Sequence, residues 1–229
     1  MLISKPETEQ ILIQRCQGIT GRTLSELANA VGQKIPHSLH YAKGWIGQLI
    51  ELHLGADSHN KSQPDFLHLN IELKTIPLNA NHLPRESTYV CTAPSGPTQG
   101  STSTLALETW ETSRVRRKLA RVLWVPIEAA PHIPIGERHV GSPLLWTLPS
   151  AMENILKQDW EELTEMLQLG QVANISAKQG VYLQIRPKAA HSRILASTIN
   201  EQGEVVLAGP KGFYLRSLFT QKILTEHYL

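Results

Sequence analysis

The clearest alternation of polar and apolar positions runs over residues 70–76, Asn-Ile-Glu-Leu-Lys-Thr-Ile, and it predicts a short strand. Because successive side chains of a strand point to opposite faces, Glu72 and Lys74 share one face and Ile71 and Leu73 share the other. Asp65 precedes Glu72 by six intervening residues, close enough for a turn to bring it back over Glu72. The pattern therefore predicts two carboxylates and an ammonium in one place.

Other periodic segments predict the remaining elements of the chain. Helical spacing and capping signals predict helices over residues 6–17, 23–32, 44–54, 114–121, 150–169 and 213–229. Short apolar runs between turn residues predict further strands over residues 87–93, 122–127, 141–147 and 181–186. The strand over 87–93 is expected to be antiparallel to the strand over 70–76 if the Pro/Asn-rich turn between them is a hairpin. Residues 94–104, rich in Ser, Thr, Gly and Pro, predict a mobile loop.

The predicted helix over residues 44–54 is apolar almost all round, which is typical of a buried helix. Glu51 is out of place there, because a buried carboxylate is costly unless it is paired or bound to a metal. An ordinary ion pair with a neighbouring Lys or Arg would explain it. Its nearness in sequence to Asp65 and Glu72 also allows Glu51 to be a third acidic residue near a shared metal ion.

Charge is concentrated on two of the predicted helices. In the helix over 114–121, helical spacing places four cations on one face: Arg114, Arg117, Lys118 and Arg121. This face is either a solvated basic surface or a phosphate-contacting one, since phosphate contacts are made by Lys and Arg. The helix over 150–169 is acidic, with Asp159 among its carboxylates, and is expected to expose a solvated face away from DNA.

Size and composition limit the possible classes of protein. A chain of 229 residues makes one large domain or one domain with two lobes. The formal net charge of +2 is only mildly basic, so any nucleic-acid surface must be local. Cys16 and Cys91 make no CxxC pair and indicate no disulfide framework, which fits a reducing cytoplasm. The first residues contain no apolar signal segment, and no predicted helix is apolar enough to span a membrane. His37 and His40 lack a second ligand pair for zinc.

The chemistry of Asp65, Glu72 and Lys74 depends on a cation. Two neighbouring carboxylates repel each other unless one is protonated or a divalent ion neutralises them. Hard oxygen ligands suit Mg²⁺, which can activate water and neutralise charge on a phosphoryl group. Lys74 would then orient the water or meet the phosphate oxygens. This Asp…Glu-x-Lys spacing is found in restriction-type nucleases, although an acidic-apolar-basic triplet on a solvated strand edge looks the same in sequence.

Several segments together resemble the MutH family of mismatch-repair endonucleases. They are residues 43–47, 49–55, 65–66, 72–77, 110–113, 121–124, 140–146, 159–163, 182–190 and 212–215. The resemblance covers nearly the whole chain in order. It implies an α/β restriction-endonuclease-like fold: a mixed sheet flanked by helices, forming a single domain over residues 1–229 with two lobes around a DNA-binding cleft.

The resemblance implies nicking of the unmethylated strand at hemimethylated GATC sites, with Mg²⁺ as cofactor. It also implies a monomer that is activated by MutL, with MutS acting indirectly. By position, Asp65, Glu72 and Lys74 resemble the catalytic set. Glu51 resembles a further carboxylate near the metal, and Lys118 a second lysine near the reacting phosphate.

The resemblance also implies a set of DNA-binding residues. Arg186 and Pro187 match the turn that reads GATC, and arginine is the residue that most often reads guanine directly. Tyr214 matches a residue near the adenine whose methylation is sensed. Lys43 and Gly44 match a DNA-contacting segment of the family. From the residues themselves, Arg114 and Arg117 on the basic helix and Lys188 after the proline turn are further expected DNA contacts.

Some positions depart from the family pattern, and two other functions stay open. Tyr89 stands where Phe is expected, Arg114 replaces a histidine, and the loop over residues 94–107 is long. One alternative is a stand-alone restriction enzyme that dimerises and cuts both strands without an activator. The other is a DNA-binding module without catalysis, which would require the catalytic set to be broken.

Overall fold

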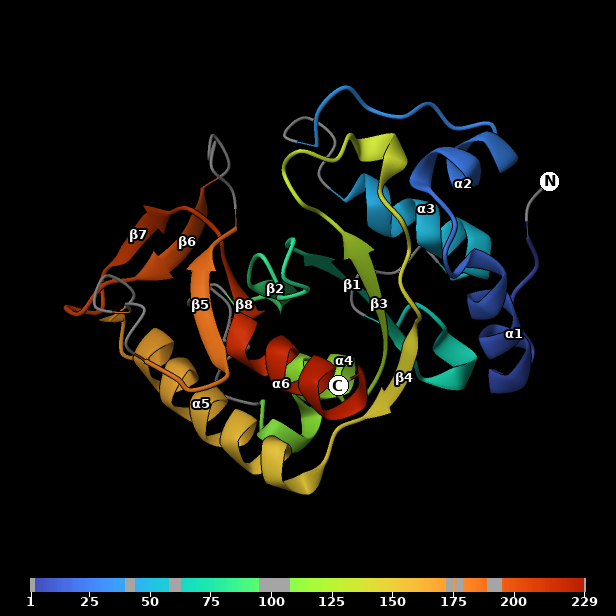
Figure 1. The fold of residues 1–229 in the computed structure, drawn as a ribbon. Coiled ribbons are helices and arrows are strands. Elements are labelled where there is room, and N and C mark those ends of the chain that lie inside the picture. The colour runs from blue at the N-terminus through green and yellow to red at the C-terminus, as the bar shows by residue number, and fades with distance from the viewer. Residues whose placement is uncertain are drawn as a thin grey trace. The chain divides into compact units, whose positions relative to one another are not determined.

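The computed structural model describes residues 3–39, 44–57, 63–94, 108–171, 175, 179–188 and 195–228. The chain forms two compact units (Figure 1). Unit 1 contains residues 1–86 and 120–147, and unit 2 contains residues 87–119 and 148–229. The chain therefore passes twice from unit 1 to unit 2, and each unit is built from segments that are distant in sequence. The DNA cleft that the resemblance implies stays a prediction.

Unit 1 is a three-stranded sheet covered by helices. The strands are β1 (Glu72–Leu78), β3 (Arg121–Glu128) and β4 (Leu144–Thr147), in the order β1-β3-β4. β1 and β3 are parallel, and β3 and β4 are antiparallel. The helices are α1 (Glu9–Ile19), α2 (Leu24–Ala30) and α3 (Trp45–Leu54), with 3-10 turns η1 (Leu67–Leu69) and η4 (Ile135–Glu137). This is the mixed sheet with flanking helices that the resemblance implies.

The core of unit 1 lies between α1, α2, α3 and one face of the sheet. Side chains from all three helices form one cluster with Ile71, Leu73 and the alternate residues of β3, among them Leu123 and Val125. Burial of this apolar surface is the main force that holds the helices on the sheet. The other face of β1 carries Glu72 and Lys74, so the alternation predicted from the sequence is confirmed.

Polar contacts fix the position of α3 in unit 1. The Arg15 side chain donates from Nη1 to the carbonyl oxygens of Ser4 at 2.6 Å and Leu54 at 2.8 Å. The buried His53 ring contacts the Leu27 carbonyl oxygen through Nε2 at 2.9 Å. These contacts connect the C-terminal end of α3 to α1 and α2, because unpaired carbonyls at a helix end need donors from elsewhere.

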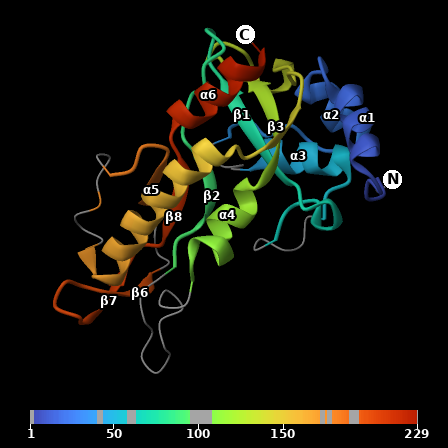
Figure 2. The same cartoon turned by 90° about the horizontal axis from the view of Figure 1, so that it is seen from below.

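Unit 2 contains an antiparallel sheet in the order β2-β8-β5. Its strands are β2 (Thr88–Thr92), β8 (Lys211–Leu215) and β5 (Leu183–Pro187), and a separate hairpin joins β6 (Ala196–Ile199) to β7 (Val205–Ala208). The helices are α4 (Arg114–Leu119), α5 (Ser150–Gln168) and α6 (Ser217–Tyr228), with the turn η3 (Trp110–Thr112). Figure 2 shows α5 running beside this sheet, as does Figure 1.

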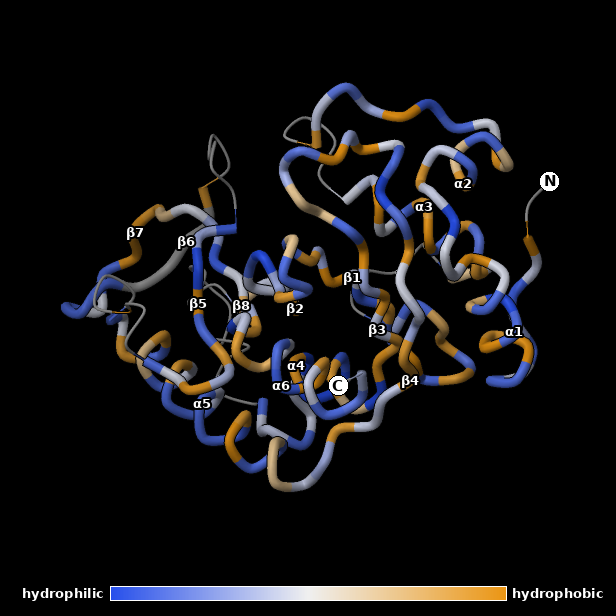
Figure 3. The backbone as a smooth tube through the Cα atoms, in the orientation of Figure 1, coloured by the Kyte–Doolittle hydropathy of each residue, from blue (hydrophilic) through white to orange (hydrophobic). Residues whose placement is uncertain are grey.

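The amphipathic character of α5 accounts for its packing. Hydrophilic and hydrophobic residues alternate along this helix (Figure 3), and its apolar side includes Leu156, Trp160 and Leu163, which are buried. The Trp160 ring lies 6.0 Å from that of Trp110 on η3. On α6, Phe219 is also buried, and its ring meets that of Tyr182 edge to face. The helix predicted over residues 150–169 is thus confirmed.

Two predictions about these elements are wrong. β2 does not form a hairpin with β1, because β2 pairs with β8 in unit 2. After β1 the chain makes a single bridge between Leu78 and Pro84, and Pro77 and Pro84 have no N–H to extend a ladder. The helix predicted over 213–229 begins only at Ser217. The residues before it form β8, where aromatic and apolar side chains fit a pleated surface.

Across the residues that the structure describes, no helix combines the length and the apolar character needed to cross a membrane.

Candidate functional site

A tight turn brings Asp65 back to the start of β1. Phe66 and Ile71 are bridged by two backbone hydrogen bonds, of 2.9 and 3.2 Å, across η1. Asn70 closes the turn with a φ of 54°, a left-handed conformation that Asn adopts more readily than most residues. Asp65 Oδ2 then accepts the backbone N–H of Leu73 at 2.8 Å. The turn predicted between Asp65 and Glu72 is therefore confirmed.

Glu72 and Lys74 form an ion pair on the face of β1 opposite the core. Lys74 Nζ donates to Glu72 Oε1 at 2.8 Å. The two residues are only 3% and 8% exposed, so the reading of this triplet as a solvated strand edge is wrong. Removing two charges from water is costly, and hydrogen-bonded pairing offsets part of that cost. The protein thus holds a carboxylate and an ammonium in fixed positions at a buried place.

The neighbouring strands give this pair an apolar wall. Glu72 lies beside Val122 in the sheet register, and Lys74 lies beside Trp124. Trp124 is fully buried, and its ring meets that of Trp146 on β4 edge to face at 6.1 Å. Low polarity around a charged pair strengthens its electrostatic interactions. No spacing in the sequence marks a role for these tryptophans, although residues 121–124 and 140–146 belong to the segments that resemble MutH.

Two of the three predicted carboxylates, those of Asp65 and Glu72, suit a magnesium ion. Within the described residues, no three or more His, Cys, Asp or Glu side chains are grouped so that they could hold a metal ion. Glu51, half-buried on α3, therefore does not form such a group with Asp65 and Glu72. Mg²⁺ is commonly bound by one or two carboxylates together with waters and substrate phosphate. Asp65 and Glu72 suit that mode of binding, and a metal-binding role for Glu51 stays a prediction.

A second group of predicted residues lies on one face of the β2-β8-β5 sheet in unit 2. In the register, Tyr89 of β2 lies opposite Tyr214 of β8, and Thr92 lies opposite Gly212, which in turn lies opposite Arg186. Their side chains therefore share a face. The opposite face is apolar and buried; it carries Cys91, Phe213, Ile185, Leu183 and Leu215. We call the face that carries Tyr89, Thr92, Tyr214 and Arg186 the tyrosine face.

The two cations of β5 and its end lie over this face. The Arg186 guanidinium is 5.9 Å from the centre of the Tyr214 ring, and its Nη1 donates to Ser87 Oγ at 2.5 Å. Lys188 Nζ lies 5.6 Å from the centre of the Tyr89 ring. Arg186, Pro187 and Lys188 are exposed. The structure therefore brings Arg186, Lys188 and Tyr214 together, as predicted, and adds Ser87 and Tyr89 to them.

Gly212 lies under the two tyrosine rings. A Cβ atom at this position would come within 3.0 Å of Tyr89 Cε2 and 3.2 Å of Tyr214 Cε2. The missing side chain lets the rings meet edge to face with centres 5.3 Å apart. Close approach of this kind is a common reason for glycine in a strand.

Asp159 of α5 holds the start of β5. Its carboxylate accepts three backbone N–H groups, from Val181 at 2.7 Å, Tyr182 at 2.6 Å and Leu183 at 2.8 Å. The residue is 4% exposed, so its predicted place on a solvated acidic face is wrong. Gly180 must be glycine here, because its φ is +75° and a Cβ would lie 2.0 Å from the Leu183 carbonyl oxygen.

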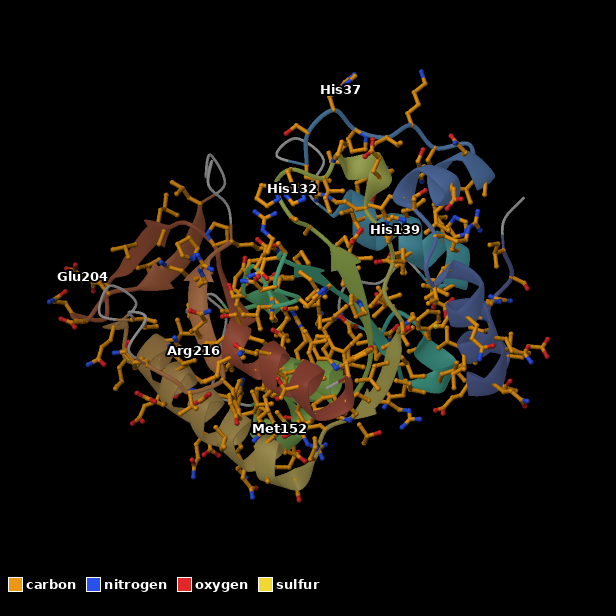
Figure 4. All side chains as sticks on the ribbon, in the orientation of Figure 1. His37, His132, His139, Met152, Glu204 and Arg216 are labelled. Carbon is orange, nitrogen blue, oxygen red and sulfur yellow. The ribbon has the colours of Figure 1, made fainter. Side chains whose placement is uncertain are left out.

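The turn before β5 is also tied to the end of β8. Arg216, which is labelled in Figure 4, makes two of these contacts. Its backbone N–H donates to the Tyr182 carbonyl at 2.8 Å. Its Nη2 donates to the Gln179 carbonyl at 2.6 Å. Together with Asp159, these bonds fix the strand whose far end carries Arg186.

The basic helix differs from its prediction. α4 ends at Leu119, Lys118 is buried beside Val115 and Leu119, and Arg121 belongs to β3. The prediction that four cations share one face of this helix is therefore wrong, because the helix is too short to include Arg121 and Lys118 lies on its buried side. Lys118 lies in unit 2, whereas Asp65 and Glu72 lie in unit 1. Its predicted place near the reacting phosphate stays a prediction.

The remaining predicted DNA contacts lie on exposed positions or outside the described residues. Arg114 and Arg117 are exposed on α4, and Arg117 Nη2 donates to the Thr112 carbonyl at 3.2 Å. Gly44 is the left-handed N-cap residue of α3 and is exposed. Lys43 and the greater part of the long loop, residues 95–107, lie outside the described residues, as does His40.

A mixed sheet with Asp65, Glu72 and Lys74 gathered at one strand is the core of a restriction-endonuclease-like fold. The family model "DNA mismatch repair enzyme MutH" matches residues 54–159. The chain is 48% identical over 228 residues to "DNA mismatch repair protein MutH" of Escherichia coli (strain K12) and of Shigella boydii serotype 4 (strain Sb227). Each match covers 100% of this chain and 96% of the relative. The chain belongs to the MutH family of DNA mismatch repair enzymes.

Proposed function

We propose that this chain is a magnesium-dependent DNA endonuclease of methyl-directed mismatch repair, which nicks the unmethylated strand at hemimethylated GATC sites. The observation that carries the proposal is the buried arrangement of Asp65, Glu72 and Lys74 on β1 in a chain of the MutH family. The proposed substrate is double-stranded DNA, and the proposed location is the cytoplasm.

Asp65 and Glu72 would hold the magnesium ion, which supplies a water of lowered pKa and neutralises charge on the scissile phosphate. Lys74 Nζ donates to Glu72 Oε1 at 2.8 Å, which holds the lysine in place. The proposed role of its ammonium is to orient the attacking water. The water gives up a proton and its oxygen bonds to phosphorus as the bond to the 3′ oxygen breaks, and the 3′ oxygen takes up a proton. The products are a 5′-phosphate and a 3′-hydroxyl.

Recognition of the site is proposed for the tyrosine face. Arg186 presents a planar fork of donors, which matches guanine O6 and N7 in the major groove. Pro187 restricts the backbone directly after it. Tyr214 is proposed to lie near the target adenine, where an added methyl group would clash with a tight contact. Overpacking of that kind costs ~1–3 kcal/mol, enough to distinguish methylated from unmethylated strands.

The proposed enzyme works as a monomer with one active site, which explains a nick in one strand. The activator is MutL, with MutS acting indirectly through it. Lys118 is proposed to approach the reacting phosphate, and Glu51 to support the metal ion. Lys43, Gly44, Arg114 and Arg117 are proposed to contact the DNA backbone.

One cleavage experiment tests the function. A plasmid with a single GATC site is prepared in unmethylated, hemimethylated and fully methylated forms and is incubated with Mg²⁺, with and without MutL. Nicking of only the unmethylated strand, stimulated by MutL, is the expected result. Cutting of both strands without MutL would instead identify a stand-alone restriction enzyme. Binding of GATC without cleavage under any of these conditions would identify a DNA-binding module.

A further inference from the structure

Three side chains of the tyrosine face form a compact polar group apart from Arg186. Lys188 Nζ donates to Thr92 Oγ1 at 2.7 Å. The Tyr89 hydroxyl and Thr92 Oγ1 are 3.0 Å apart and share a hydrogen bond. The Lys188 ammonium also lies over the Tyr89 ring. Thr92 thus holds both the cation, which directly follows β5, and the phenol, which lies on β2.

The hydrogen-bonding capacity of this group matches an anion. An ammonium has three N–H donors, and Thr92 accepts one of them. The threonine and tyrosine hydroxyls share one hydrogen bond, which leaves one hydroxyl hydrogen that can turn outward. Lys188 and Tyr89 are exposed, so these donors are accessible to a ligand from solvent. A phosphate oxygen can accept from an ammonium and a hydroxyl at the same time.

The comparison with Arg186 indicates a phosphate of the DNA backbone. Arg186 has its own hydroxyl partner, Ser87, and its own ring, Tyr214. The guanidinium is a flat fork suited to a base edge, whereas the ammonium of Lys188 is a compact point charge. Protein contacts to phosphates set the register of a protein on the duplex, while contacts to base edges carry the sequence information. The two cations on one face therefore suit the two kinds of contact.

We propose that Lys188, Thr92 and Tyr89 form a phosphate-binding subsite for the DNA backbone beside the GATC-reading arginine. Thr92 is its positioning residue, because its hydroxyl holds the ammonium above the tyrosine ring. This inference rests on the proposed function, in that the tyrosine face binds duplex DNA.

The test combines protein variants with DNA in which one phosphate is neutral. A short duplex with one hemimethylated GATC is prepared as a series, each member carrying a single methylphosphonate at a different position near the site. The dissociation constant of each duplex is measured for the wild type and for Thr92→Val, Tyr89→Phe and Lys188→Ala. Thr88→Val is the matched control, because Thr88 lies on the same strand and loses the same hydroxyl.

One methylphosphonate position is expected to weaken wild-type binding, and its effect is expected to disappear in Lys188→Ala. Thr92→Val and Tyr89→Phe should each weaken binding to the unmodified duplex by about 2- to 10-fold, the usual effect of losing one hydrogen bond. Thr92→Val added to Lys188→Ala should cause no further loss. The preference for GATC over a duplex without it should stay the same, because phosphates carry no sequence information.

Other outcomes would overturn the subsite. Additive losses in the double variant would show that Thr92 acts independently of Lys188. Wild-type affinity of Thr92→Val, or a loss equal to that of Thr88→Val, would remove the positioning role. The absence of any methylphosphonate position coupled to Lys188 would exclude the phosphate contact. In each of these cases the wild type would still prefer GATC, whereas a wild type without that preference would contradict the proposed function itself.

Discussion

Charged side chains lie on both three-stranded sheets of the protein, but their exposure to water differs. On β1 in unit 1, Glu72 and Lys74 are 3% and 8% exposed and bond to each other. On the tyrosine face of unit 2, Arg186 and Lys188 are exposed and bond to hydroxyl groups of Ser87 and Thr92. The first arrangement pairs opposite charges, while in the second the cations contact neutral hydroxyl groups and tyrosine rings.

This difference follows from what each group has to do. Chemistry on a phosphodiester needs charges that are already in place, because fixed charges in a water-poor site stabilise a transition state without reorganising. Recognition of DNA needs cations that can exchange a weak partner for a base or a phosphate. A neutral hydroxyl is such a partner, since it holds a cation in position and competes little with an anion.

The largest effect is expected where the buried pair is broken. Lys74→Ala should reduce nicking by about 10²- to 10⁴-fold, because it removes the group that presents the water. Binding of GATC should stay close to that of the wild type, because the recognition residues lie in unit 2. Single-turnover nicking and equilibrium binding on the same duplex would measure both. Lys157→Ala is a control, because it also removes a lysine paired with a glutamate, but the side chain of Lys157 is 40% exposed. Nicking at the wild-type rate would contradict the role of Lys74.

A large loss of stability is expected for the variant that removes the buried Asp159 carboxylate, because this carboxylate holds the start of β5. Asp159→Ala would leave three backbone N–H groups of the turn before β5 without their acceptor. The bonds to Tyr182 and Leu183 are buried, and each buried unsatisfied group costs about 1–3 kcal/mol, so the free energy of unfolding should fall by about 2 kcal/mol or more. Chemical denaturation would measure it.

The neighbouring Glu162→Ala is the control for the Asp159 variant, because Glu162 is an exposed acid on the same helix. It should change stability by less than ~0.5 kcal/mol, as exposed substitutions usually do. Equal stability of the two variants would show that the hydrogen bonds of Asp159 contribute little.

A moderate effect is expected for Arg186→Ala. Loss of a bidentate contact to guanine should cost about 1–3 kcal/mol of discrimination between GATC and other sequences. Non-specific binding should fall less, because other cations remain. Competition binding with matched duplexes, with and without GATC, would compare the two. An equal loss on both duplexes would show that Arg186 contacts only a phosphate.

The smallest effect is expected for a partly exposed ion pair. Arg116 Nε donates to Glu153 Oε1 at 2.6 Å and, together with Trp110, holds the pKa of Glu153 below its ordinary value. A lowered folded-state pKa gives stability that is present above the unfolded pKa and is lost as pH falls through the folded one. Glu153→Gln should therefore cost only ~0.2–1 kcal/mol near neutral pH.

The pH dependence of unfolding would check this small effect. Wild type and Glu153→Gln are expected to differ at neutral pH and to converge in acid, where Glu153 is protonated in both states. A difference that grows toward acid pH would contradict the ion-pair explanation.

Local patterns were enough to predict much of the fold. The capping box of Thr23 and Glu26 marks the start of α2, and both of its hydrogen bonds are present. The helix that ends before Gly170 and the strand that carries Glu72 and Lys74 also lie where the sequence predicts them. Such features depend on contacts between residues a few positions apart, so they can be read from spacing alone.

Long-range contacts account for the predictions that were wrong. The partner of β2 is β8, more than a hundred residues away, and no local signal shows this pairing. Asp159 looks like its exposed neighbours in sequence, yet it is buried because the turn before β5 supplies three donors. Lys118 follows a basic run but lies on the buried side of a short helix.

The sequence by itself determined the chemical set of Asp65, Glu72 and Lys74, the alternation that places two of them on one face, and the family resemblance. Only the tertiary structure decided that the pair is buried beside Trp124 and that Thr92 connects Tyr89 to Lys188. The physical reason is that strand periodicity is a property of the backbone, while burial and partners depend on which distant strands come together.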